Sequence, residues 1–89
     1  MSKKQNTVTA EQIDAMLKRA TFINFTTHDK CTIVSAKLEN GFVITETSAC
    51  VDPSNYDAAL GYKICMDRIK DKLWELEGYC LQKQLYEGK

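Results

Sequence analysis

The sequence predicts an α+β fold: a short N-terminal helix, then a three-stranded antiparallel sheet, then a long C-terminal helix. Three observations support this prediction. Apolar residues recur at helical spacing over residues 9–20, and again every three or four positions over residues 55–86. Between them, two runs of β-prone residues flank Asn40-Gly41, which is typical of a hairpin.

The first helix is predicted over residues 9–20 (TAEQIDAMLKRA). Thr9 and Gln12 have the spacing of a capping box, in which each side chain binds the other's backbone N–H. The apolar face consists of Ile13, Met16, Leu17 and Ala20. Residues 21–27 (TFINFTT) follow as a strand because β-branched and aromatic residues favour strands, and residues 28–30 form the next turn.

The next two strands, residues 31–38 and 42–48, are predicted to be joined by a two-residue type I′ turn at Asn40-Gly41. That turn requires positive φ at both positions, which Asn-Gly adopts readily. Leu38 then faces Val43 and Ala36 faces Thr45. One face carries Val34, Ala36, Leu38, Val43, Thr45 and Thr47, and the other carries Cys31, Ile33, Phe42 and Ile44. Both faces are partly apolar, so we expect at least partial cover on both.

The long helix is predicted over residues 55–86, with Ser54 as its N-cap after Pro53 has ended the last strand. Its heptad seam is Ala59, Tyr62, Met66, Ile69, Leu73, Leu76 and Cys80. The helix would be roughly 45 Å long, whereas a seven-residue strand spans about 24 Å. The overhang carries Leu76, Cys80, Leu81 and Leu85. We therefore expect a homo-oligomer, a dimer or tetramer, rather than a monomer with a folded-back tail.

Length and charge exclude several classes of protein. Eighty-nine residues make one domain, residues 9–89, preceded by a polar tail, residues 1–8, that we expect to be disordered. Twelve basic and twelve acidic residues give zero net charge, which disfavours nucleic-acid binding. No apolar stretch approaches the ~18 residues of a membrane span.

Chemistry has little support in the sequence. The four cysteines include no CxxC pair, and His28 is the only histidine, so metal-ligand spacing is missing. We expect reduced, buried, structural cysteines. His28 falls in a predicted turn, where a single histidine is usually solvated. We therefore predict a binding protein without catalytic residues, metal or cofactor.

Residues 38–85 resemble the gene 49/gene 66 family of small tailed-phage proteins. The shared features are Asn-Gly-Phe at 40–42, Ser-Ala-Cys-Val-Asp-Pro at 48–53, Asn-aromatic-Asp at 55–57 and Trp-x-Leu-Glu-Gly-Tyr at 74–79. Thr47 and Glu75 stand where the family pattern has glycine and proline, so the proline-type helix break before Leu76 is not expected here. The resemblance implies a phage accessory protein that acts in the host bacterial cytoplasm, and it supplies no catalytic residues.

Small phage proteins commonly trap a signalling molecule or mask a host protein. The leading hypothesis is a counter-defence protein that sequesters a cyclic nucleotide immune signal between subunits, without turnover. The candidate ligand-binding residues are Arg19 and Lys63 for phosphates, Thr45, Thr47 and Asn55 for polar contacts, and Tyr56 for stacking. The alternative is a protein–protein inhibitor that masks a host factor through exposed apolar residues near Leu81 and Leu85. A virion component is a third class, and no repeat in the sequence favours it.

Overall fold

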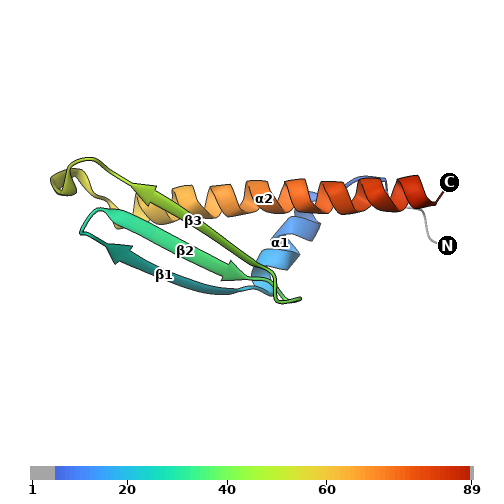
Figure 1. The fold of residues 1–89 in the computed structure, drawn as a ribbon, viewed down its shortest axis with the longest axis horizontal. Helices are drawn as coiled ribbons and strands as arrows, with labels where there is room; N and C mark the ends of the chain where they lie inside the picture. Colours follow the sequence, from blue (N-terminus) through green and yellow to red (C-terminus); the bar gives the residue numbers. More distant parts are fainter. Residues whose placement is uncertain (1–5, 89) are drawn as a thin grey trace.

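The computed structural model describes residues 6–88 and has the predicted α+β architecture (Figure 1). The elements are α1 (Ala10–Lys18), β1 (Thr21–Thr27), β2 (Cys31–Lys37), β3 (Val43–Ala49), the short 3-10 helix η1 (Pro53–Asn55) and α2 (Ala58–Glu87). The strands form one antiparallel sheet in the order β1-β2-β3. Of the tail predicted over residues 1–8, residues 1–5 lie outside the described residues, and Val8 packs against the core.

Helix α1 begins where the sequence predicts. Thr9 is its N-cap, its side chain accepts from the Gln12 backbone N–H, and its own N–H donates to Gln12 Oε1 at 2.8 Å. This reciprocal pair satisfies two N–H groups that a helix start leaves without partners. Ile13 is buried, while Met16 and Leu17 are half-buried against the core, as the predicted apolar face requires.

The predicted pairing between β2 and β3 is wrong by one residue. Ala36 faces Ile44 and Lys37 faces Val43, and the loop between Leu38 and Phe42 has three residues rather than two. Only Gly41 has positive φ, at 96°, whereas the predicted turn needs Asn40 there as well. Asn40 instead accepts a hydrogen bond from the Phe42 N–H through Oδ1 at 3.0 Å, which stabilises the longer loop.

The one-residue shift moves alternate side chains to opposite faces of the sheet. Ile44 joins Val34 and Ala36 on the face that packs against α2, and all three are buried. Thr45 and Thr47 lie on the opposite face, which the ribbon shows without a covering helix (Figure 1). The expectation of cover on both faces is therefore not met within residues 6–88 of a single chain.

Helix α2 begins three residues later than predicted. Asp57, not Ser54, is its N-cap, and its carboxylate accepts from the Leu60 N–H at 3.2 Å. Asp52 caps the separate η1 turn and accepts from the Ser54 N–H at 3.0 Å. A 3-10 turn at Pro53 thus reverses the chain before the long helix starts.

The buried stripe of α2 also differs from the predicted seam. It consists of Gly61, Cys65, Ile69 and Leu73, four residues apart at each step. Ala59 is exposed and Tyr62 is 38% exposed, so the start of the predicted seam is wrong. Four later seam residues are buried in or packed against the core: Met66, Ile69, Leu73 and Leu76. Gly61 sits directly against Thr32 of β2, and a Cβ there would lie 2.9 Å from Thr32 Cβ. Small residues allow α2 to approach the sheet closely at this end.

Helix α2 runs along the sheet, crosses α1 and continues past both, and the molecule is 55 Å long (Figure 1). Leu76 packs against the core, while Leu81 and Leu85 are half-buried and Cys80 is exposed. The distal part of α2 therefore extends beyond the sheet in the single chain, as predicted, although Leu76 does not belong to the exposed part. Among the described residues, no helix is long and apolar enough to cross a membrane.

Candidate functional site

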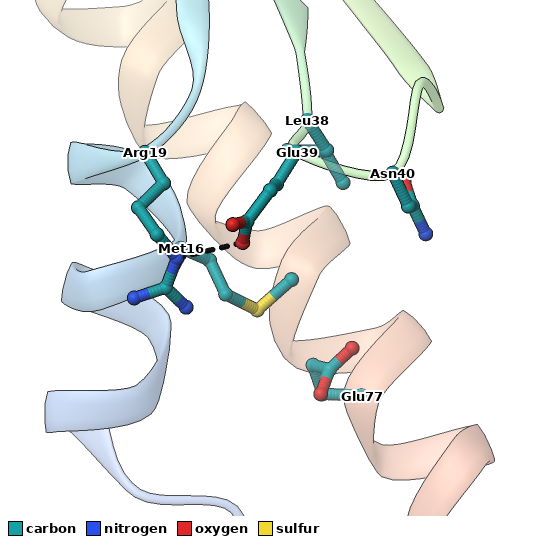
Figure 2. Close-up of a pocket in the computed structure, with 6 residues that line it drawn as sticks. All are labelled: Met16, Arg19, Leu38, Glu39, Asn40 and Glu77. Carbon is teal, nitrogen blue, oxygen red and sulfur yellow. Dashed lines mark hydrogen bonds and ion pairs between the residues drawn. The ribbon is translucent and has the colours of Figure 1, made fainter.

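A hollow on the described surface lies where α1, the β2–β3 loop and α2 meet. Its volume is about 340 Å³. The lining residues are Met16 and Arg19 from the end of α1, Leu38, Glu39 and Asn40 from the loop, and Glu77 from α2 (Figure 2). Small-molecule sites usually occupy about 300–1,000 Å³, so this hollow is at the lower end of that range.

Arg19 and Glu39 form an ion pair across this hollow. Arg19 Nε donates to Glu39 Oε1 at 2.8 Å, and the two side chains are 53% and 68% exposed. Only one of the guanidinium nitrogens is used, and the two terminal nitrogens have no partner within residues 6–88 (Figure 2). Because a guanidinium offers five donors, Arg19 can bind a further anion or carbonyl while it holds Glu39.

The other lining groups make the hollow amphipathic. Met16 and Leu38 supply an apolar surface, and the Asn40 side chain holds its oxygen on the Phe42 N–H, which leaves its amide nitrogen as a free donor among the described residues. Glu77 adds a second carboxylate. The charges sum to one negative charge, so phosphate groups would experience repulsion from Glu77 as well as attraction to Arg19.

A second polar cluster lies at the opposite end of the sheet, around Tyr56. The Tyr56 hydroxyl is within hydrogen-bond distance of both Thr26 Oγ1, at 2.8 Å, and Thr32 Oγ1. A hollow of about 140 Å³ beside it is lined in part by Asn55, Tyr56 and Leu60. Tyr56 is therefore tied to the sheet through its hydroxyl, which restricts its ring to one position.

Three of the predicted ligand-binding residues lie elsewhere. Thr45 Oγ1 donates to Ser35 Oγ at 3.0 Å on the uncovered sheet face, and the Thr47 carbonyl accepts from Arg68 Nη1 at 2.6 Å at the β3 edge. Lys63 pairs with Asp67 at 3.1 Å on the exposed side of α2. Arg19 precedes the start of β1, whereas Tyr56 contacts Thr26 near its end, so about 17–20 Å of strand separates them. The six residues do not converge in one chain.

The residues that sequence reasoning missed are Glu39, Asn40 and Glu77. Asn40 was interpreted only as a turn former, and the two glutamates carry no spacing signal because they lie far apart along the chain. Arg19 was the one predicted residue that lines this hollow. Its position after the last turn of α1 and before β1 was the useful signal.

The cysteines are free thiols, as predicted, but only Cys65 is fully buried. Burial raises the pKa of the Cys65 thiol, so it stays protonated near neutrality. Cys80 is exposed and Cys31 and Cys50 are half-buried, so the prediction of four buried cysteines is wrong for these three. Within residues 6–88, no group of three or more His, Cys, Asp or Glu side chains is arranged to hold a metal ion.

Two acidic residues already occupy N–H groups in and after the loop that precedes α2. The Ser54 and Leu60 N–H groups are bonded to the carboxylates of Asp52 and Asp57. The hydrogen bonds from Ser54 lower the pKa of the Asp52 carboxyl, which keeps it ionised in this role. Capping, rather than phosphate binding, is thus the function of this segment's acidic residues.

Comparison with known proteins gives one match. No curated protein and no solved structure is significantly similar to the chain. A family model matches residues 8–85, which extends the similarity from the region after Leu38 to α1 and β1 as well. The chain therefore belongs to the phage protein (N4 Gp49/phage Sf6 gene 66) family.

Proposed function

We propose that this phage protein binds and sequesters a cyclic nucleotide immune signal in the host cytoplasm, without chemical turnover. The observation that supports this most directly is the hollow in which Arg19 presents two uncommitted guanidinium nitrogens beside an apolar floor. A nucleotide combines an anionic phosphate with a flat, amphipathic base, and these groups match the two parts of the hollow.

The contacts follow from the lining. The terminal nitrogens of Arg19 bind a phosphate oxygen, Met16 and Leu38 contact the face of the base, and the free Asn40 amide nitrogen donates to an acceptor on its edge. Glu39 keeps Arg19 Nε while the terminal nitrogens bind the phosphate, although the Glu39 carboxylate repels it. Because this repulsion weakens the phosphate contact, binding favours ligands that also fill the apolar part of the hollow.

A single chain offers about 340 Å³, so we place only part of a cyclic dinucleotide in one hollow and the rest in the hollow of a second subunit. A homo-oligomer is thus part of the proposal. Thr45, Thr47, Asn55, Tyr56 and Lys63 remain predictions that would require a neighbouring subunit to bring them to the ligand.

Titration calorimetry with cyclic mono- and dinucleotides tests the proposal. Arg19→Ala should weaken binding by at least tenfold, whereas the control Lys18→Ala, on the adjacent exposed residue of α1, should not change it. Ligand recovered after denaturing the complex should be unmodified. A ligand present at 100 times its Kd should raise the free energy of unfolding by ~2.7 kcal/mol. If no nucleotide tested gave a binding heat or raised the Tm, sequestration of those nucleotides would be refuted.

Glu77 gives a second, opposite-sign test of the same site. Its carboxylate lines the hollow, so Glu77→Gln removes a like charge and should tighten the binding of an anionic ligand several-fold. Glu75→Gln, two residues away on the exposed surface of α2, is the matched control for the change in net charge. Equal effects of the two variants would show that only net charge matters and that the ligand lies elsewhere.

The alternative is a protein–protein inhibitor that masks a host factor. Tyr79 and Tyr86 are 69% and 73% exposed on the distal half of α2, close in sequence to the half-buried Leu81 and Leu85. Binding hot spots of protein interfaces are enriched in tyrosine. Loss of phage protection on Tyr79→Ala or Tyr86→Ala, with Arg19→Ala retaining protection, would favour masking over sequestration.

A further inference from the structure

Strand β1 is an open edge without the usual protection. Its sequence, TFINFTT, contains no charged residue, proline or glycine. Edge strands of natural proteins commonly carry lysine, proline or a bulge that prevents them from pairing with another strand. All seven residues of β1 pair with β2 in continuous register, so no bulge interrupts the strand.

Both faces of β1 are also poorly covered. Ile23 and Phe25 on one face are 63% and 48% exposed. On the other face, Asn24 and Thr26 are exposed although the adjacent Val34 of β2 is completely buried beneath α2. Helix α2 packs on β2 and β3, and on the same face of β1 it leaves Asn24 uncovered, whereas Phe22 packs against the core and Tyr56 reaches Thr26.

The opposite edge of the sheet is partly occupied. At β3, Arg68 of α2 donates to the Thr47 carbonyl at 2.6 Å and Lys72 lies 3.8 Å from Glu46. One outward backbone acceptor of β3 is thus occupied, and two helix α2 side chains contact that strand. The asymmetry points to β1 as the edge that is available for a partner.

The hydrogen-bond pattern shows which atoms of β1 are available. Leu38 N donates to Phe42 O at 2.8 Å and Cys50 N to Lys30 O at 3.0 Å. Because bonded pairs alternate along an antiparallel ladder, the even-numbered residues of β2 bond to β3 and its odd-numbered residues bond to β1. In β1 the backbone groups of Phe22, Asn24 and Thr26 therefore point away from the sheet.

We propose that β1 pairs in antiparallel fashion with β1 of a second copy, about a two-fold axis at Asn24, to give one six-stranded sheet. This register bonds Asn24 to its own equivalent and Phe22 to Thr26 of the second copy, for about six backbone hydrogen bonds. Ile23 and Phe25 of the two chains then face each other in close, non-hydrogen-bonded pairs. No charged side chain on β1 opposes the contact, so the strand is complementary to itself.

The pairing has a consequence that rests on the proposed function. The two α2 helices would lie on the same side of the six-stranded sheet, and the central β1 pair would form the floor of a trough between them. Asn24 and Thr26 of both chains line this floor, with the two Tyr56 hydroxyls beside Thr26. In this register Arg19 of each copy lies beyond Thr27 of the other copy, so the two Arg19 hollows lie at opposite ends of the pair. A ligand shared between two such hollows therefore needs a second contact between subunits, as in a tetramer.

Disulfide trapping tests the pairing without any nucleotide, so its result is independent of the proposed function. In a background with serine at positions 31, 50 and 80, Asn24→Cys places two thiols across the axis at a Cα separation of about 5.5 Å, within disulfide range. It should cross-link on mild oxidation. Ile23→Cys is the matched control. The two Ile23 positions lie diagonally across the axis, about 7–8 Å apart, so cysteines there should not cross-link.

Solution mass gives the second readout. The wild-type chain should have at least twice its 10.1 kDa mass by light scattering. Asn24→Pro removes an outward N–H without touching the ladder to β2, so it should reduce the mass attributable to this contact and leave the circular dichroism spectrum unchanged. A monomeric wild type, equal cross-linking of both cysteine variants, or an unchanged mass for a folded Asn24→Pro would each overturn the proposal.

Discussion

The close contact between Gly61 and Thr32 makes a sharp prediction about stability. Gly61→Ala would place a Cβ 2.9 Å from Thr32 Cβ, and closer still to Thr32 Oγ1. Thr32 is only 4% exposed, and its hydroxyl is engaged with Tyr56. Since a Cβ is fixed to its backbone, the side chain cannot rotate out of the way, and α2 has to move away from β2.

The expected magnitude combines two opposing effects. Overpacking of a well-filled interior typically costs about 1–3 kcal/mol, and the contact with a Cβ atom puts this site at the upper end. Alanine is favoured over glycine within a helix by about 1 kcal/mol. We therefore expect Gly61→Ala to lower the free energy of unfolding by about 2 kcal/mol. For a domain of this size that corresponds to a fall in Tm of roughly 8–16 °C.

Thermal and urea unfolding followed by circular dichroism, at one protein concentration, measures this change. Gly78→Ala is the matched control, because it lies in the same helix and a Cβ there meets no atom within 4 Å. That variant should be more stable than wild type by about 0.5–1 kcal/mol. If Gly61→Ala were stabilised as much as Gly78→Ala, the argument that Gly61 sets the approach of α2 to the sheet would be refuted.

Three further predictions concern the chain's turns, caps and thiols. Asp29 has φ of 58°, so Asp29→Gly should stabilise the fold by about 0.5 kcal/mol in urea titrations. Asp67→Gly within α2 should instead cost about 0.5–1 kcal/mol, through lower helix propensity and loss of the ion pair with Lys63. Asp57→Ala should lower stability by about 1 kcal/mol through loss of the N-cap, and Asp57→Asn should retain most of it; equal losses would contradict a capping role. Because the pKa of Cys65 is raised in the folded state, its contribution is present below the thiol's usual pKa and is lost as pH rises above it, so the urea midpoint should fall as pH rises above about 8.5. Cys65→Ala should show a shallower fall above that pH, and an unchanged slope would count against the assignment.

The predicted elements agree with the structure where their signals are local. The Thr9 and Gln12 capping box, the strand at Thr21–Thr27 and the long C-terminal helix are all present. Each depends on residues within a few positions of one another, and the physics that favours them acts over the same short range.

The predictions failed where two local solutions compete. Asn40-Gly41 is compatible with a two-residue turn and with the observed three-residue loop, and the buried position of Ile44 is satisfied only by the second. The positive φ values that a type I′ turn requires at successive residues occur instead at His28 and Asp29. The turn conformations of both hairpins depend on which strand side chains are buried in the core.

The candidate site was the least predictable feature. Arg19 was chosen from its place between α1 and β1, but Glu39 and Glu77 are 20 and 58 positions away in the sequence. Only the packing of α2 beside α1 brings Glu77 to the same hollow. Nothing in the local sequence of α2 distinguishes Glu77 from Glu75, which points elsewhere.

The sequence by itself determined the type, order and approximate bounds of the elements, because helical and strand periodicity and capping are properties of neighbouring residues. The tertiary structure decided the register of β3, the buried face of α2 and the lining of the hollow. Gly61 shows the reason: the sequence indicated a weak point in a helix, whereas packing made the absence of a side chain the condition for contact with Thr32. Such contacts join residues far apart in the chain, and only the folded backbone brings them together.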